Sequence, residues 1–414
     1  MGVATELAKS AKIASRTVAL LDSETKSALL CAIGDALIAN TDQILAANQL
    51  DLAAAEANGV RPTMIDRLTL NGARIQSMAE GAREVAALPD PIGEVLEERT
   101  LENGLHLVKR RVPLGVIGII FEARPNVTSD AAVLCLKSGN ATVLRGGKEA
   151  IHSNLAIAEV MREVLAAHQV DPNAICLIPD TSRDSATELM GCKGLVDVLI
   201  PRGGKGLIQS VIQNAKVPVI ETGAGNCHLY VDADADLTMA TKILVNAKCS
   251  RPSVCNAIET LLVHKSIADV FLPQAAEALA PYHVELRGDP RTCSILPSAL
   301  PATEADYETE YNDFILAIRV VLNPETAINH INQYGTMHSE AIVTKNDVVA
   351  TRFQNEVDAA AVYVNASTRF TDGFEFGLGA EIGISTQKMH ARGPMGLREL
   401  TSTKYTLYGT GQVR

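Results

Sequence analysis

Residues 114–147 read LGVIGIIFEARPNVTSDAAVLCLKSGNATVLRGG, and the expected fold follows from this stretch. Leu114–Phe121 is a continuous apolar run of strand length, and Ala141–Leu144 is a second one. Between them lie a loop and a helix that ends at residues 138–140. Continuous apolar strands are typical of parallel sheets, which helices cover on both faces. The stretch therefore predicts a strand–helix–strand unit of a parallel sheet.

The same alternation continues along the rest of the chain. Apolar positions recur at helical spacing through residues 3–88, which predicts a block of helices before the first strand. Further strands are predicted at 174–178, 196–201, 217–220, 228–231, 259–263, 314–321, 341–343 and 361–365. Helices between them complete an α/β fold with parallel-rich sheets. We expect ligands of such sheets at the carboxyl ends of the strands.

Two segments that alternate apolar and polar residues lie outside this pattern. In residues 93–112, Asn103 and Gly104 separate two such runs, which is the signature of a hairpin with a two-residue turn. The tail, 400–413, alternates in the same way, so it can pair with the hairpin. The pattern is equally consistent with an arm that packs on another subunit and with an ordinary surface element.

Composition limits the classes of function. A chain of 414 residues is too long for one simple core, so two or three domains are expected. The net charge of −11 argues against nonspecific nucleic-acid binding, and no apolar run reaches the length of a membrane span. The N-terminus lacks a signal-peptide pattern, and the eight scattered cysteines include no CxxC pair. We therefore expect a cytoplasmic protein with reduced thiols and no metal site.

One cysteine lies in a run that can present it to a ligand. Residues 246–264 read NAKCSRPSVCNAIETLLVH, in which Arg251 and Pro252 end a helical pattern and Cys255 precedes an apolar strand. The thiolate is the reactive form of cysteine, and a neighbouring guanidinium such as that of Arg251 lowers the thiol pKa. The local pattern fits equally well a small, buried apolar residue.

Two glycine-rich turns follow predicted strands, at residues 202–206 and 145–148. Backbone N–H groups at the start of a helix favour anions, so both turns are candidate phosphate sites, although glycine as a simple turn former is commoner. Glu221 and Asn126 also follow strands. Taken alone, they are more often a surface or cap acid and a turn residue.

The ordered set of motifs resembles the aldehyde dehydrogenase superfamily, and most closely its branch that reduces an acyl phosphate of glutamate. The resemblance covers essentially the whole chain and rests on the runs VPLGVIGIIFEARPNVTSDAA, LKSGNATVLRGGKEA, LIPRGGKGLI, VIETGAGNCHLYVD, RPSVCNAIETLLVH, YVNASTRFTDGFEFGLGAEIGIST and ARGPMGL. It implies that Cys255 is the nucleophile and that Asn126, with the Cys255 backbone N–H, stabilises the oxyanion. Glu221 falls where oxidising relatives keep a general base.

The resemblance also implies a binding site for NADPH. Glu310 matches the acid that holds the nicotinamide ribose. The other matches are a cofactor-contacting turn, Arg202, Gly203 and Gly204, and two cations near the adenosine ribose, Arg145 and Lys148. An anionic substrate needs further cations, for which the candidates are Arg124, Arg251 and Arg369.

The sequence departs from the superfamily at two places. The usual Glu-Leu-Gly-Gly-Lys turn is Glu221-Thr222-Gly223-Ala224-Gly225, and Arg124-Pro125 stands where a tryptophan usually precedes the catalytic amide. Both changes suit an enzyme that reduces an acyl phosphate and need not hydrolyse a thioester. The implied reaction converts L-glutamate 5-phosphate to L-glutamate 5-semialdehyde in proline biosynthesis. The alternatives are a coenzyme A-acylating aldehyde dehydrogenase and a catalytically silent dinucleotide-binding protein.

The implied architecture has three parts. We expect a dinucleotide-binding domain at 1–225 with a return segment at about 376–399, and a catalytic domain at 226–375. Residues 95–112 and 400–414 would form an oligomerisation element of a homodimer or homotetramer. Neither nucleic acid nor a membrane is expected as a partner.

Overall fold

The chain divides after Glu221. In the computed structural model, which describes residues 2–60 and 62–414, the first unit comprises Met1–Glu221, Gly377–Gly383 and Met395–Arg414. The second unit comprises Thr222–Phe376 and Ile384–Pro394. Residues after 376 therefore contribute to both units.

The helical block expected before the first strand is present in the first unit. Asp22 caps the second helix by accepting the Thr25 N–H, and Asn71 caps the fifth by accepting the Arg74 N–H. Both caps satisfy backbone donors that a helix start leaves without partners. The helices are α1 (Val3–Val18), α2 (Ser23–Ala39), α3 (Thr41–Ala57), α4 (Pro62–Leu68) and α5 (Gly72–Ala87).

The first sheet has four parallel strands in the order β5-β4-β3-β6, with β3 buried along its whole length. Small apolar side chains of α1 and larger ones of α8 pack against one face. The strands are β3 (Val116–Phe121), β4 (Ala141–Arg145), β5 (Ile175–Leu177) and β6 (Val198–Arg202). The connecting helices are α6 (Asn126–Lys137), α7 (Ile151–Ala167), α8 (Arg183–Met190) and α9 (Lys205–Asn214).

The fifth strand predicted at 217–220 is wrong. A single bridge joins Val219 to Leu199, with the Leu199 N–H donating to the Pro218 carbonyl and the Ile220 N–H to the Leu199 carbonyl. Pro218 has no N–H, so the ladder cannot extend toward the start of the segment.

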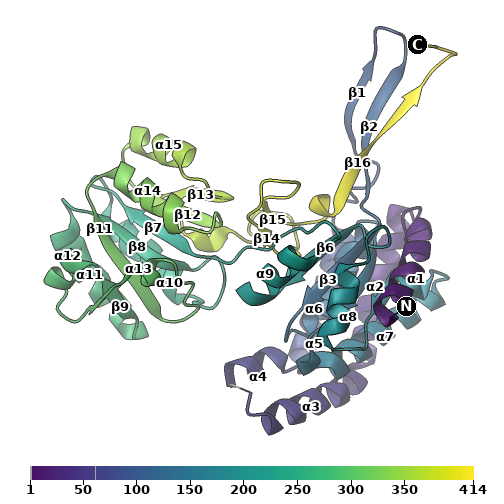
Figure 1. Ribbon diagram of the computed structural model, residues 1–414, viewed down its shortest axis with the longest axis horizontal. Coiled ribbons are helices and arrows are strands. Elements are labelled where there is room, and N and C mark those ends of the chain that lie inside the picture. Colours follow the sequence, from purple (N-terminus) through teal and green to yellow (C-terminus); the bar gives the residue numbers. More distant parts are fainter. Residues whose placement is uncertain (1, 61) are drawn as a thin grey trace. The chain divides into compact units, whose positions relative to one another are not determined.

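The predicted pairing of the hairpin with the tail is confirmed. β1 (Val95–Thr100), β2 (His106–Pro113) and β16 (Thr401–Tyr408) form an antiparallel sheet in that order, and they project from the rest of the first unit (Figure 1). The predicted two-residue turn is wrong, because the Leu101 N–H donates to the Leu105 carbonyl and leaves three residues in the loop. Gly104 (φ +82°) takes the left-handed position of this longer turn.

The second sheet has seven parallel strands in the order β10-β9-β11-β8-β7-β12-β13. They are β7 (Cys227–Val231), β8 (Ile258–His264), β9 (Glu285–Gly288), β10 (Leu300–Pro301), β11 (Ile315–Val321), β12 (Ser339–Val343) and β13 (Ala361–Val364). The sequence missed β9 and β10, which lie at one edge. β9 carries Glu285 and Arg287, and β10 has only two residues, so neither shows an apolar run.

Helices cover both faces of the second sheet (Figure 1). Leu229 and Leu261 point toward α10 and α11, whereas their chain neighbours Tyr230 and Leu262 point toward α14 and α15. This alternation is the period of two of a β-strand. The helices are α10 (Leu237–Cys249), α11 (Ala268–Leu279), α12 (Pro290–Ile295), α13 (Glu304–Tyr307), α14 (Pro324–Tyr334) and α15 (Asp347–Glu356).

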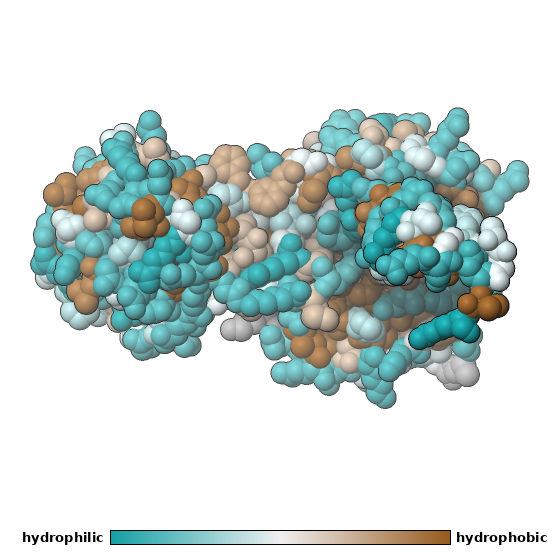
Figure 2. Space-filling view, turned by 90° about the horizontal axis from the view of Figure 1, so that it is seen from above, coloured by the Kyte–Doolittle hydropathy of each residue, from teal (hydrophilic) through white to brown (hydrophobic). Residues whose placement is uncertain are grey.

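Hydrophilic residues cover much of the visible surface in the space-filling view (Figure 2). In the described residues, no single helix has the length and apolar character of a membrane span. Among the helices that the structure describes, the pair α2 and α3, bent by 67° at their junction, meets that criterion when the two are counted together.

Candidate active site

Cys255 lies in the loop between α10 and β8, at the amino end of β8. Its residue is partly exposed, whereas Ala257 and most of β8 are buried. The amino ends of β7 and β11 lie on either side, because both strands pair with β8 in parallel. The expected location at carboxyl ends therefore does not hold for Cys255, because the loop that carries the thiol leads into its strand.

Gly225 packs directly against the backbone of Cys255. A Cβ atom on Gly225 would lie 1.5 Å from the Cys255 carbonyl oxygen and 2.6 Å from its Cα. The Gly225 N–H donates to Glu310 Oε1 at 2.8 Å. Glycine is required here because two backbone segments approach too closely for any side chain.

Asn256 and Arg369 hold the cysteine loop to the segment that follows β13. Asn256 Nδ2 donates to the carbonyl oxygens of Arg369 (3.3 Å) and Thr371 (2.9 Å). The Arg369 guanidinium donates to Asn256 Oδ1 and, at 3.1 Å, to Ser250 Oγ. The positions on both sides of Cys255 are thus held to the segment after β13.

Two arginines act on the charge near the thiol. Burial lowers the pKa of Arg369, the Arg251 charge lowers it further, and a Cys255 thiolate opposes both effects. A thiolate at Cys255 is therefore stabilised by the Arg369 guanidinium. Arg251 is exposed and Arg369 is half-buried.

Two other cysteines in the second unit are unsuited to nucleophilic chemistry. Cys227 is fully buried, donates to the Cys255 carbonyl at 3.2 Å, and has a pKa that burial raises well above its usual range. Burial also raises the pKa of Cys249, to about 11. Buried thiols of raised pKa stay protonated and inert.

In the first unit, Asn126 is the first residue of α6 and donates from Nδ2 to Asp130 Oδ2 at 2.8 Å. Burial raises the pKa of Asp130 to about 6, against the effects of Asn126, Ser129 and Arg202. Arg124 is exposed in the loop before α6, and Glu221 is half-buried at the end of the unit.

The turn at Arg202, Gly203 and Gly204 joins β6 to α9. The Gly204 N–H donates to Glu122 Oε2 at 2.9 Å. A Cβ on Gly203 would lie 2.5 Å from that oxygen and 2.8 Å from Leu207 Cδ2, so a side chain here would displace the ends of Glu122 and Leu207. The turn exposes backbone at a helix start, and its Gly204 N–H is held by a carboxylate, as a helix start favours anions.

The two predicted cations after β4 differ in their surroundings. Arg145 Nη2 donates to the carbonyl oxygens of Thr181 (2.6 Å) and Ser182 (2.8 Å), and burial lowers the Arg145 pKa. Lys148 is exposed. Lys148 is therefore the better placed of the two to meet a cofactor phosphate, since Arg145 already holds a neighbouring loop.

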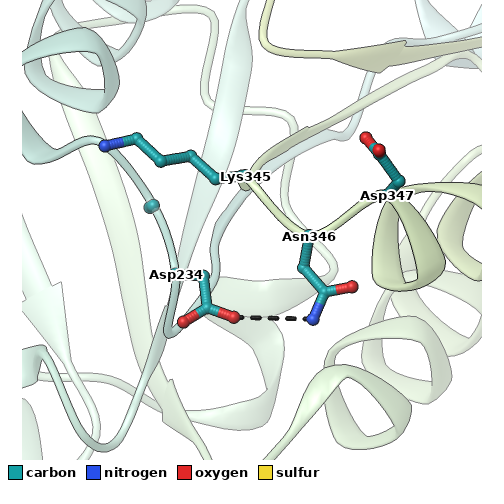
Figure 3. Close-up of a pocket in the computed structure, with 5 residues that line it drawn as sticks. Asp234, Lys345, Asn346 and Asp347 are labelled. Carbon is teal, nitrogen blue, oxygen red and sulfur yellow. Dashed lines mark hydrogen bonds between the residues drawn. The ribbon is translucent and has the colours of Figure 1, made fainter.

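A surface pocket of the second unit lies at the opposite end of the sheet from Cys255. Asp234 follows β7, and Lys345, Asn346 and Asp347 follow β12 (Figure 3). Asp234 and Asn346 are joined by a hydrogen bond of 3.5 Å. Two carboxylates would repel an anionic substrate, so this pocket does not extend the site at Cys255. Among the residues described, no group of three or more His, Cys, Asp or Glu is arranged to hold a metal ion.

Comparisons with known proteins assign the chain to a family. A family model described as the aldehyde dehydrogenase family matches residues 3–295. The chain belongs to the aldehyde dehydrogenase family. The resemblance inferred from the sequence runs and the α/β fold class are thereby confirmed, and with them an oxidoreductase that uses a nicotinamide cofactor.

Within the aldehyde dehydrogenase family, several full-length relatives of the chain share one name. The chain is 61% identical to the gamma-glutamyl phosphate reductase of Carboxydothermus hydrogenoformans, over 99% of this chain and 98% of the relative. It is 59% identical to that of Enterococcus faecalis, with the same coverage. The crystal structure of the Thermotoga maritima gamma-glutamyl phosphate reductase covers 100% of both chains, with 47% identity and a TM-score of 0.98.

Two charged residues of the candidate site were not singled out from the sequence. Lys248 and Glu259 form a buried ion pair (2.5 Å) across the two ends of the cysteine loop, and Glu259 also accepts the Asn312 N–H at 3.0 Å. Burial raises the Glu259 pKa to about 7, although Lys248 opposes this. The sequence does hold a signal for this pair, because Lys248 and Glu259 are charged residues within the mainly apolar segments before and after Cys255.

Proposed function

We propose that the protein reduces L-glutamate 5-phosphate to L-glutamate 5-semialdehyde and phosphate, a step of proline biosynthesis. The observation that carries this proposal is the thiol of Cys255 on a loop fixed by Asn256 and Arg369, with Arg369 placed to stabilise a thiolate. The names of the full-length relatives supply the substrate. For the same reason the coenzyme A-acylating and catalytically silent alternatives are not favoured.

The first half of the reaction is a substitution at the acyl carbon. The Cys255 sulfur forms a bond to that carbon, the carbon–oxygen bond to phosphate breaks, and a thioester remains. Covalent catalysis of this kind splits one difficult step into two easier ones. Negative charge builds on the carbonyl oxygen in both halves, and Asn126 is proposed to donate to it. One such donor is typically worth about 10²–10³ in rate.

The second half needs a hydride, which the bound nicotinamide cofactor supplies. The carbon–sulfur bond then breaks and releases the aldehyde and the Cys255 thiolate. Water has no part in this sequence, so Glu221 is not required as a base for hydrolysis. Gly225 and Glu310 are proposed to hold their loop for the nicotinamide ribose, because they are joined beside the Cys255 backbone.

We propose NADPH as the cofactor, bound at the Arg202–Gly204 turn and Lys148 of the first unit. The 2′-phosphate of NADPH is close to a dianion at neutral pH and needs a cation to replace its water. Lys148 is exposed at the carboxyl end of β4, whereas Arg145 acts mainly by holding residues 181 and 182.

The substrate carries a phosphate and a carboxylate, so it needs cations. Arg251 and Arg369 are proposed to bind it beside Cys255, with Arg124 as a third cation. The protein is further proposed to be a cytoplasmic homo-oligomer. Its arm supports this, because Tyr405, Leu407 and Tyr408 of β16 are each more than half exposed and suit burial against a second copy.

The test runs the reaction in reverse, by oxidation of glutamate 5-semialdehyde with NADP⁺ and phosphate. We expect phosphate-dependent NADPH formation, its loss in Cys255→Ser, and near-normal rates in the control Cys249→Ser. Activity that does not depend on phosphate, or that survives in Cys255→Ser, would overturn the proposal.

A further inference from the structure

Asp130 lies one turn after Asn126 on α6, so the two side chains share a face of the helix. Asn126 Nδ2 donates to Asp130 Oδ2 at 2.8 Å. Ser129 Oγ donates to the Asn126 carbonyl at 3.0 Å and lies 3.4 Å from Asp130 Oδ1. A short network therefore surrounds the amide, and Asp130 is its acceptor.

The surroundings of Asp130 raise the pKa of its partly buried carboxyl group. Burial raises its pKa to about 6, and the Arg202 guanidinium at the end of β6 opposes that shift. The hydrogen bonds of Asp130 go to the side chains of Asn126 and Ser129 rather than to the N–H groups at the start of α6. Asp130 is therefore not a helix cap, and its partly buried carboxylate is held by these two side chains.

A carboxylate oxygen only accepts hydrogen bonds, and this fixes the orientation of the amide beside it. If the Asn126 side chain turned over, its Oδ1 would face Asp130 Oδ2, and two acceptors would repel each other. With Nδ2 toward Asp130, one N–H is used and the second N–H of the same nitrogen remains a donor. The acid thus selects one of two amide orientations.

We propose that Asp130 is a positioning residue, whose carboxylate holds Asn126 Nδ2 so that its second N–H can donate to the carbonyl oxygen of the substrate. This inference rests on the proposed function, in which Asn126 stabilises the oxyanion. The chemical class of the ligand is an acyl group that becomes tetrahedral during attack and reduction.

The test is a double-mutant cycle with Asn126→Ala and Asp130→Ala, which isolates the interaction between two residues. Asn126→Ala should lower kcat about 10²–10³-fold. Asp130→Ala should lower kcat by up to about 10²-fold, the loss expected when a reacting group is misplaced, with the KM for NADPH nearly unchanged. In the Asn126→Ala background, Asp130→Ala should have no further effect on kcat.

Asp130→Asn is the conservative variant, because its amide oxygen can still accept from Asn126 Nδ2. It should keep more activity than Asp130→Ala, and it serves in the same cycle if Asp130→Ala does not fold. Asp184→Asn, an exposed acid on α8, controls for loss of charge and should leave kcat unchanged.

The outcomes separate the two proposals. Equal losses from Asp130→Ala with and without Asn126, or no loss at all from a folded Asp130→Ala, overturn the positioning role. Full activity of Asn126→Ala instead removes Asn126 from the reaction, and with it the donor on which the inference depends. Inactivity of the unmodified protein toward the semialdehyde would be a failure of the proposed function itself.

Discussion

Gly225→Ala should displace the backbone of the cysteine loop and so lower activity, although it changes no reactive side chain. The new Cβ would lie 1.5 Å from the Cys255 carbonyl oxygen, and Cβ contacts below 3.0 Å essentially never occur. Neither atom belongs to a flexible side chain, so the two backbone segments must move apart by more than an ångström. The Gly225 N–H bond to Glu310, 2.8 Å long, must shift with them.

The size of the effect follows from this movement. A misplacement of about 1 Å at a reacting group costs on the order of 10²-fold in rate, so kcat should fall by about that factor or more. Overpacking of this kind typically costs about 1–3 kcal/mol of stability. For a unit of this size, that is a fall of several degrees in the melting temperature, roughly 2–4 °C per kcal/mol.

The assay is reverse turnover with glutamate 5-semialdehyde, together with thermal unfolding and the alkylation rate of Cys255 by iodoacetamide. Gly81→Ala is the matched control, because a Cβ there meets nothing within 4 Å in the middle of α5. Gly81→Ala should keep full activity, and its free energy of unfolding should rise by about 0.5–1 kcal/mol. A folded Gly225→Ala with the parental kcat and alkylation rate would refute the argument.

Glu221→Gln should slow phosphate release far less than Cys255→Ser does, because hydride rather than water resolves the thioester; a folded but equally inactive variant would contradict this. Deletion of 401–414 removes β16 from the arm and should give smaller assemblies by light scattering, whereas an unchanged mass would count against a subunit interface. Lys148→Ala should raise the KM for NADPH by about one to two decades, since a charged hydrogen bond contributes about 1.5–3 kcal/mol, and should spare NADH; equal losses with both cofactors would exclude reading of the 2′-phosphate. Burial holds the pKa of His338 at about 4, so the unfolded chain, with a histidine pKa of about 6.5, takes up a proton that the folded chain does not as pH falls through this window. The free energy of unfolding, measured by urea titration, should therefore fall with decreasing pH less steeply in His338→Gln than in the unmodified protein. The two slopes should differ by up to about 1.4 kcal/mol per pH unit, and equal slopes for the two proteins would contradict this.

The strands of both sheets were largely predictable because parallel strands are buried on both faces and read as apolar runs. β3 shows this most clearly, since it is buried along all its residues. The strands that were predicted wrongly or missed lack this simple relation between burial and an apolar run. β9, which lies next to the two-residue edge strand β10, carries charged residues, and at 217–220 one proline stops the ladder. The hairpin was found, but one hydrogen bond, from Leu101 to Leu105, changed its turn.

The site was predictable only in part, for a physical reason. Motifs identified Cys255, and the runs on either side placed it before a strand. The residues that fix its loop are distant in sequence, such as Arg369 with Asn256 and Glu310 with Gly225. Contacts between residues so far apart in the sequence form only when the chain folds, so the spacing of nearby residues cannot predict them. The same applies to Arg145, whose partners lie on a loop 36 and 37 residues later.

The proposed reaction depends on a thioester between Cys255 and the substrate. The most direct measurement is to mix the protein with L-glutamate 5-phosphate without a reduced cofactor, quench in acid and locate the acyl group by peptide mass spectrometry. We expect one equivalent of released phosphate and a hydroxylamine-sensitive glutamyl adduct on the peptide that contains Cys255. An adduct on another residue, or phosphate release with no adduct on that peptide, would contradict it.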